Sequence, residues 1–326
     1  MSEIATKKRM GWLDIAKTIA MVTVVTVHST KEFSLPMLIC VSFCMQIFAA
    51  SAGVTIKKID WKDIPMATLK DCKQLFIPYA ICYVVMQFLL GYTGREVALP
   101  FYMYLLGIFT DDNPGMIWFF SALFWGRLIY RMLLHIPSEW GRSLTVILFT
   151  VIGIVLGNFF NFPLRIDVAM VCLLFIEEGY QIGRITKNNP GVLNKPKWYY
   201  AIVLVGIIIW AIIVPGLHST ISFASIGARY NPFPGFLAAP VILPFMFLLA
   251  EAFESVKVIG PFMEWFGRNT YTFFFIHFFD EFWILKVTPG FLDRSVMWAC
   301  YRMCVDGAIF LIVIGVLSLI KRRRDK

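Results

Sequence analysis

The sequence predicts an all-α protein, a polytopic bundle of transmembrane helices, and three observations support this prediction. First, 59% of the 326 residues are hydrophobic and 31 are phenylalanine, whereas soluble domains are about 45–50% apolar. Second, several stretches approach or exceed the roughly 20 apolar residues that cross a bilayer. Third, the basic residues gather in alternate connections between those stretches, as they do in membrane proteins.

Ten apolar stretches are predicted to span the membrane. In chain order they cover residues 11–29, 35–56, 74–92, 115–134, 143–161, 166–184, 198–217, 234–253, 269–286 and 295–320. Basic residues bound most of them, from "KKR" before the first to "KRRRDK" after the last. The longest interruptions, 93–114 and 218–233, are too short for a soluble domain. Residues 1–326 are therefore predicted to form one membrane domain.

The distribution of basic residues predicts the orientation of the bundle. A cytoplasmic N-terminus puts 22 of the 30 Lys and Arg residues in cytoplasmic segments and six in outer segments. Because positive residues accumulate on the cytoplasmic side, both termini are predicted to be cytoplasmic. The net charge of +9 then reflects topology and contact with anionic membrane lipid, and no nucleic-acid partner is expected.

Missing motifs exclude several classes of function. The sequence has no Walker A motif, no G-x-G-x-x-G, no H-E-x-x-H and no G-x-S-x-G between a strand and a helix, which argues against an ATP-driven pump, a nucleotide-dependent redox enzyme and a serine hydrolase. The seven cysteines lie mostly within spans and form no C-x-x-C pair. They are expected to be buried apolar residues, and no metal is expected.

Glycines at helical spacing predict where helices pack closely. Gly153 and Gly157, and likewise Gly179 and Gly183, are four residues apart within their spans. Two small residues on one helix face allow the backbone of a second helix to approach.

The first span, "LDIAKTIAMVTVVTVHST", carries three ionisable residues that a helix would align. Because an α-helix advances about 100° and 1.5 Å per residue, Lys17 and His28 lie within about 20° of each other and about 16 Å apart. Asp14 lies about 40° from His28. Such a polar stripe is costly in lipid, so it is expected to face a protein interior or a wet cavity. Alternatively, Asp14 and Lys17 simply neutralise each other, and His28 is an interfacial histidine.

Polar residues in later spans are candidates for binding ligands. In "LKDCKQLFIPYA", Lys70 and Lys73 lie one turn apart on a cytoplasmic helix face; they either anchor the helix or hold the phosphates of an anionic ligand. Asp167 lies at the outer end of the sixth span, and His277 lies about midway along the ninth as a core histidine or a binding group. Trp118 suits an aromatic belt or a surface on which a sugar ring stacks.

Other charges within the spans are expected to have structural roles. Arg302 and Asp306, one turn apart in the last span, are predicted to neutralise each other. Glu177 and Glu178 are predicted to pair with nearby lysines rather than to take part in chemistry.

These residues resemble the bacterial acyltransferase-3 family. Its opening pattern of Asp, two residues, Arg or Lys, ten residues and His is matched by Asp14, Lys17 and His28. Its two basic residues before an apolar-Pro-Tyr sequence are matched by Lys70 and Lys73, where the family usually has Arg. Four further motifs follow the family's order: "FAASAGV", "IWFFSALF", "FIEEGYQIGR" and "GRNTYTFFFIH". The resemblance covers about residues 10–280 and is closest to the fucose-4-O-acetylase-like branch.

The resemblance implies an O-acetyltransferase of the bacterial cytoplasmic (inner) membrane. It would transfer an acyl group, usually acetyl, from cytoplasmic acetyl-CoA or another acyl-CoA to a hydroxyl of a cell-envelope polysaccharide or a lipid-linked sugar. His28 would act as general base or carry a transient acyl group. The implied site consists of catalytic His28, Asp14 and Lys17, donor-binding Lys17, Lys70 and Lys73, and acceptor-binding Asp167, His277 and Trp118.

A transporter is the main alternative, either a proton-coupled exporter or a lipid-linked sugar flippase. Buried Lys, Asp and His residues suit proton coupling, but the prolines and glycines do not form the paired broken helices of inverted repeats. A third alternative, a scaffold subunit, leaves the polar stripe as an unexplained cost. The acceptor, the acyl chain and the oligomeric state stay open, a homodimer included.

Overall fold

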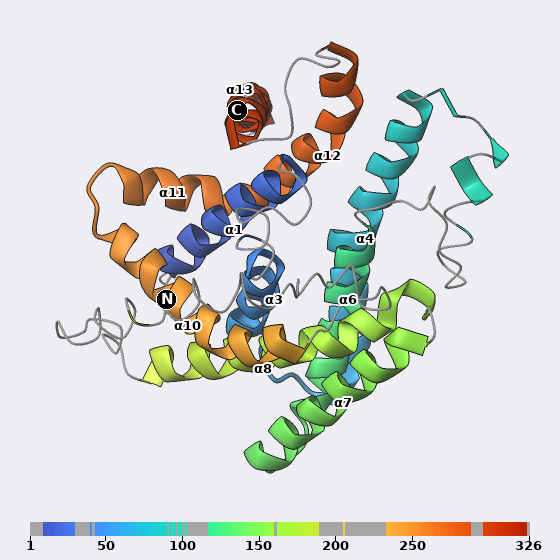
Figure 1. Cartoon of the computed structure of the whole chain (residues 1–326), viewed down its shortest axis with the longest axis vertical. Helices are drawn as coiled ribbons and strands as arrows, with labels where there is room; N and C mark the ends of the chain where they lie inside the picture. The colour runs from blue at the N-terminus through green and yellow to red at the C-terminus, as the bar shows by residue number, and fades with distance from the viewer. Residues whose placement is uncertain are drawn as a thin grey trace.

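The computed structural model confirms the all-α fold. It describes residues 9–29, 40, 43–89, 91–92, 94–95, 97–99, 102, 117–159, 162–188, 205, 233–287 and 296–324, among which every regular element is helical. The α-helices (Figure 1) are α1 (Gly11–Ser29), α3 (Cys44–Thr55), α4 (Ile64–Leu89), α6 (Ile117–Leu133), α7 (Glu139–Phe159), α8 (Ile166–Asn188), α10 (Phe233–Glu254), α11 (Ile259–Arg268), α12 (Thr270–Val287) and α13 (Val296–Arg324). The predicted span 198–217 lies, apart from residue 205, outside the described residues.

The first predicted span, α1, is the central helix of the described part of the molecule. It packs against α3, α10, α11, α12 and α13, which surround it in Figure 1. Ile15, Ala20, Met21 and Val25 are fully buried, as expected for the apolar faces of a helix that other helices surround. Asp14 is 2% exposed, so the first part of the polar stripe is enclosed by protein rather than lipid.

Helices α3 and α8 cross in backbone contact because glycines remove the side chains between them. A Cβ atom on Gly53 would lie 2.0 Å from the carbonyl oxygen of Ile176, and one on Gly179 would lie 1.9 Å from that of Ala50. Gly153 also brings α7 close to the backbone of α8, with 2.7 Å from its Cβ position to the carbonyl oxygen of Asp167. The packing role predicted for Gly153 and Gly179 is therefore confirmed.

A buried carboxylate joins α6, α7 and α8. Glu177 accepts hydrogen bonds from the Tyr130 hydroxyl (2.5 Å), Arg142 Nε (3.0 Å), the Ser143 hydroxyl (3.1 Å) and Gln181 Nε2 (2.6 Å). We call these five residues the Glu177 cluster. The predicted pairing of Glu177 with a lysine was wrong, because the arginine of a neighbouring helix reaches the carboxylate with two bonds.

Apolar side chains on the outside of the bundle indicate contact with lipid. In the described part of the chain, three helical segments are long and apolar enough to cross a membrane: Trp61–Leu89, Glu139–Gly157 and Val296–Ile320. Ile77 and Ile81 on α4 and Leu311 and Ile312 on α13 are exposed. Exposed side chains of this size on a membrane-length helix favour a hydrocarbon environment.

The helix that contains the third predicted span begins before that span. Its helix, α4, starts at Ile64 rather than near residue 74, after a 3₁₀ turn at Trp61–Asp63. Most residues of "MATLKDCKQL" (Met, Ala, Leu, Lys and Gln) are good helix formers, so the helix continues beyond the apolar run. Lys70 and Lys73 therefore lie within a regular helix.

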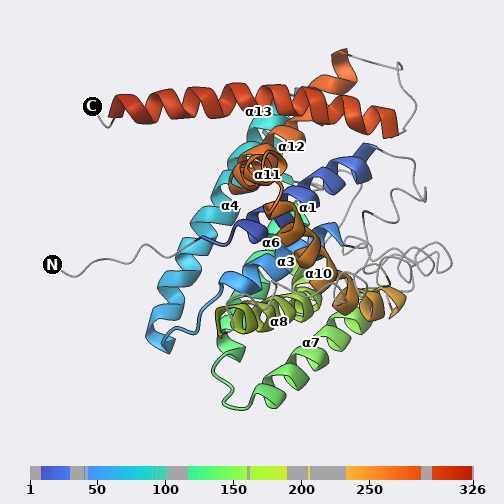
Figure 2. The same ribbon diagram turned by 90° about the vertical axis from the view of Figure 1, so that its left-hand side faces the viewer.

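The start of α1 and the end of α13 lie on the same side of the molecule, as Figure 2 shows. This arrangement agrees with termini on one side of the membrane. That this side is the cytoplasmic one stays a prediction from the basic residues.

Candidate active site

Two histidines that are far apart in the sequence lie side by side. His28 is in the last turn of α1 and His277 is in α12, and their ring centroids are 5.5 Å apart with the ring planes tilted by 60°. His28 is exposed, whereas His277 is completely buried. The structure thus brings together two of the predicted site residues.

Two carboxylates hold the buried histidine. His277 Nδ1 lies 3.0 Å from Asp280 Oδ2 and 3.0 Å from Asp306 Oδ2. Asp280 is on the same helix, three residues later, and Asp306 comes from α13. Both carboxylates are fully buried. Among the described residues, His277 Nε2 and Asp306 Oδ1 have no hydrogen-bond partner.

Arg302 connects these carboxylates to the end of α1. Its Nε donates to Asp280 Oδ2 (2.7 Å), and its Nη2 donates to the other oxygen of Asp280. Its Nη1 donates to the carbonyl oxygen of His28 (2.9 Å). This carbonyl is in the last turn of α1, where carbonyls lack partners within the helix and a cation is favourable. We call His277, Asp280, Arg302 and Asp306 the His277 cluster.

The predicted pairing of Arg302 with Asp306 was wrong. The spacing within α13 is right for such a pair, but α12 presents Asp280 to the guanidinium with both oxygens, and Asp306 bonds to His277 instead. A bidentate arginine–carboxylate pair is stronger than a single contact between neighbours on one helix.

At the other end of α1, Asp14 is the centre of a group of cations. Lys17 Nζ lies 3.0 Å from Asp14 Oδ1, the guanidinium of Arg9 donates to both carboxylate oxygens, and Arg268 Nε lies 3.9 Å away. Asp14 and Lys17 therefore do pair with each other, the simpler of the two predicted alternatives. They lie eleven or more residues from His28, so the polar stripe divides into two separate sites.

Helix α11 determines the surroundings of Asp14. A Cβ atom on Gly267 would lie 1.8 Å from the carbonyl oxygen of Asp14, so only glycine allows α11 to cross α1 here. The Thr18 hydroxyl also donates to the carbonyl oxygen of Met263, at 2.5 Å. Arg268 is thereby brought to Asp14. The first part of "GRNTYTFFFIH" thus forms the junction between α11 and α12.

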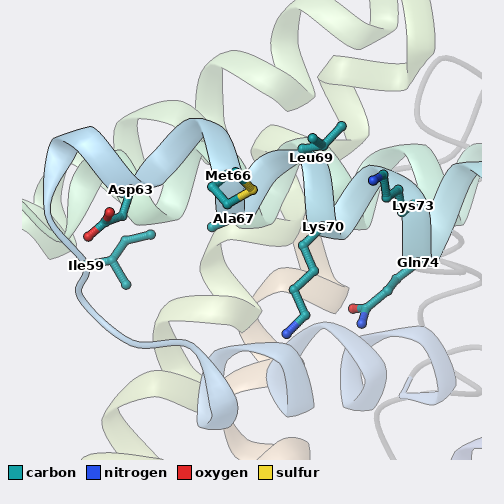
Figure 3. Close-up of a pocket in the computed structure, with 8 residues that line it drawn as sticks. All are labelled: Ile59, Asp63, Met66, Ala67, Leu69, Lys70, Lys73 and Gln74. Atoms are coloured by element: carbon teal, nitrogen blue, oxygen red, sulfur yellow. The ribbon is translucent and has the colours of Figure 1, made fainter.

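Lys70 and Lys73 lie beside an open depression of about 610 Å³ on α4. Figure 3 shows the Lys70 side chain extending from the same side of the helix as Gln74, with Lys73 on another side. Both lysines are exposed, and neither ammonium group pairs with a carboxylate of the described residues. The remaining lining residues are Ile59, Asp63, Met66, Ala67 and Leu69.

Between these lysines, a buried aspartate holds two arginines. Asp71 is 4% exposed and pairs with Arg127 Nε (3.0 Å) and Arg131 Nη1 (2.5 Å) of α6. This cluster fixes α4 against α6. It therefore sets the direction in which Lys70 and Lys73 point, and sequence analysis did not identify it.

Asp167 lies in a strained turn at the start of α8. It is 2% exposed, and its Oδ1 is 3.4 Å from Arg165 Nε. Leu164 and Arg165 have φ of 54° and 52°, which costs of order 1–3 kcal/mol for each non-glycine residue. The Ser121 hydroxyl of α6 donates to the Leu164 carbonyl and holds this turn. Trp118 is in α6, but its side chain lies outside the described part of the chain.

Sequence analysis missed the partners of His277. The spacing of His277 and Asp280 by three residues was a usable signal, since such residues are neighbours on a helix. The contributions of Arg302 and Asp306 depend on how α12 packs against α13, for which the sequence carried no local signal.

The fold and site define an integral membrane protein with a histidine-containing polar site between helices. Residues 10–320 match the acyltransferase-3 family, described as an acyltransferase domain. The chain belongs to this family and is a membrane acyltransferase. No curated protein and no solved structure matches the chain. The fucose-4-O-acetylase-like branch stays a prediction.

Proposed function

We propose that the protein is an O-acetyltransferase that transfers acetyl from cytoplasmic acetyl-CoA to a hydroxyl of a cell-envelope polysaccharide or a lipid-linked sugar. The bacterial cytoplasmic membrane is its proposed location. The observation that carries this proposal is the contact between His28 and His277 at one end of α1, opposite the end where cations gather. One helix thus has a group suited to proton transfer at one end and groups suited to phosphate at the other.

The cationic end of α1 suits the phosphates of acyl-CoA. Arg9, Lys17 and Arg268 supply three positive charges there against the carboxylates of Asp14 and Glu264. The exposed Lys70 and Lys73 lie on a different helix, α4, which packs against α6 and α12, and supply two further positive charges. In the proposal, Lys17, Lys70 and Lys73 hold phosphate as point charges, since lysine lacks the planar fork of arginine. Asp14 positions Lys17 and does not touch the reacting groups.

The histidine end suits acyl transfer. His28 takes the proton from an acceptor hydroxyl as the oxygen attacks the thioester carbonyl, and then returns that proton to the departing thiolate of CoA. Lys17 and His28 are about 16 Å apart along the helix, which an extended pantetheine arm can bridge. His28 is exposed, so a substrate can reach its ring, and Asp167 and Trp118 are the proposed contacts of the acceptor.

The direct test uses the purified protein in nanodiscs with radiolabelled acetyl-CoA and a lipid-linked oligosaccharide as probe substrates. Acetyl-CoA and succinyl-CoA are compared to identify the acyl group. The proposal expects label in an ester on the oligosaccharide, and loss of that product in His28→Ala with an unchanged melting temperature. Full activity of His28→Ala would remove this residue as the base.

Lys70→Ala combined with Lys73→Ala tests the donor site. The double variant is expected to raise KM for acetyl-CoA by about tenfold, since losing two phosphate contacts costs about 1–2 kcal/mol, while kcat stays the same. An unchanged KM would show that the phosphates bind elsewhere. Oligosaccharide counterflow in liposomes without acetyl-CoA would instead favour a flippase.

A further inference from the structure

The two histidines have different surroundings. His277 is fully buried and bonds through Nδ1 to two carboxylates. His28 is exposed, and no carboxylate of the described residues lies within ion-pair distance of its ring. When the surroundings of two titratable groups of one kind favour the protonated state of one and the unprotonated state of the other, the first suits the role of proton or hydrogen-bond donor and the second suits the role of base.

The charges of the His277 cluster require one more proton. Asp280 and Asp306 carry two negative charges when ionised, and Arg302 carries one positive charge. These side chains are at most 5% exposed, and a net charge in such surroundings is costly. One proton on His277 or Asp306 makes the cluster neutral.

A divalent cation fits this cluster less well than a proton. Ligand atoms of His277, Asp280 and Asp306 lie within 4.8 Å of one another, a set that could hold a metal ion. However, Arg302 already bonds to both oxygens of Asp280. Two further positive charges would change the net charge from −1 to +1, whereas a single proton brings it to zero.

Two of the possible positions of the extra proton make a donor of His277 Nε2. If His277 is doubly protonated, both ring nitrogens carry hydrogen. If Asp306 is protonated on Oδ2 and donates to Nδ1, the neutral ring carries its hydrogen on Nε2. A proton on Asp306 Oδ1 would instead make Nδ1 the donor and leave Nε2 bare, and the NMR experiment below distinguishes this state from the first two. In the first two states Nε2–H is buried, without a partner among the described residues, and belongs to the ring that contacts His28. A buried donor without a partner is costly unless a ligand accepts its hydrogen bond.

We propose that His277 is a catalytic hydrogen-bond donor that stabilises the oxyanion formed from the thioester carbonyl; this proposal rests on the proposed function. The acceptor oxygen forms a bond to the carbonyl carbon, His28 takes the acceptor proton, and the carbonyl oxygen becomes an oxyanion that accepts from His277 Nε2–H. The C–S bond then breaks, and His28 gives its proton to the thiolate. His277 keeps its proton throughout.

Arg302 and Asp306 are positioning residues in this scheme. Arg302 holds both histidines, one through the His28 carbonyl and the other through Asp280. Asp306 retains the additional proton at the ring. Neither residue needs to touch the substrate.

Kinetics of the reconstituted enzyme test the role of His277. His277→Leu is expected to lower kcat by about 10²–10³-fold, the usual effect of removing one oxyanion donor, with KM for acetyl-CoA unchanged. His277→Gln retains an N–H donor of similar reach and should lose clearly less. Glu177→Gln is the matched control, because it alters another buried charged cluster, for which no contact with either histidine is observed in the described part of the chain, and kcat of the folded protein should stay the same. Wild-type kcat in His277→Leu would overturn the proposal.

Nitrogen NMR tests the proton directly and needs no substrate. The chain has four histidines, so ¹⁵N-histidine labelling gives few signals, and His277→Gln identifies those of His277. The proposal expects a protonated Nε2 at neutral pH, and a changed signal in Asp306→Asn. A bare Nε2, or one equivalent of tightly bound metal by elemental analysis, would overturn it. If wild-type protein transfers no acyl group but shows a protonated Nε2, then the proposed function fails and not the assignment of the proton.

Discussion

The Glu177 cluster and the His277 cluster both bury charge within the bundle, but they differ in how completely their polar atoms are bonded. Glu177 accepts from four side chains of three helices. In the His277 cluster, Nε2 of the ring and Oδ1 of Asp306 have no partner among the described residues. A fully bonded cluster stabilises a fold, whereas unpaired buried atoms cost free energy and indicate a site for a ligand. The comparison therefore separates the Glu177 cluster, whose polar atoms are bonded, from the His277 cluster, which we propose to be functional.

Arg302→Leu should have the largest effect, because it breaks the His277 cluster. It leaves two buried carboxylates without their cation, and losing one partner of a buried pair costs about 3–5 kcal/mol. It also releases the His28 carbonyl. We expect a large fall in melting temperature in detergent and no measurable acyl transfer. Arg302→Lys, which retains the charge but not the fork, should recover part of the stability; if it recovers none, the bidentate geometry itself is essential.

Glu177→Gln should affect stability and leave catalysis unchanged. The amide keeps the size of the side chain but leaves Arg142 without its counter-charge, so a loss of about 2–4 kcal/mol is expected. The measurement is thermal unfolding together with kcat per folded molecule. A fall in kcat comparable with that of Arg302→Leu would contradict the division between the two clusters.

Gly179→Ala tests how much the close packing of α3 against α8 contributes to the stability of the protein. Its Cβ would lie 1.9 Å from the carbonyl oxygen of Ala50, so α3 must move, at a cost of about 1–3 kcal/mol. Gly307→Ala on α13 is the control, since its Cβ would meet nothing within 4 Å. Equal melting temperatures for the two variants would show that α3 and α8 do not cross as described.

Much of the architecture could be predicted because hydrophobic length and helical spacing are local properties. The helices and the glycines of close crossings follow from runs and spacings within single segments, as at Gly153 and Gly179. Helix boundaries were less predictable, as at α4, because a membrane helix can continue into water when its polar residues favour helix.

The site was predicted in part. His28 and His277 were identified as candidates, but Arg302 was assigned the wrong partner, and Asp71 and Asp280 were not considered as partners of arginines. Ion pairs between helices depend on which helix faces pack together. A periodic pattern in the sequence shows that one face of a helix is polar, but it does not show which helix packs against that face.

The sequence by itself determined that this protein is a helical membrane protein of the acyltransferase-3 family, because composition, spacing and motif order are properties of the chain alone. Only the tertiary structure decided that the polar residues of α1 divide into two sites, and that His28 meets His277 rather than any residue of its own helix. The physical reason is that a buried charge is stable only when a side chain of opposite charge lies within bonding distance of it. In a bundle, that partner comes from whichever helix packs alongside.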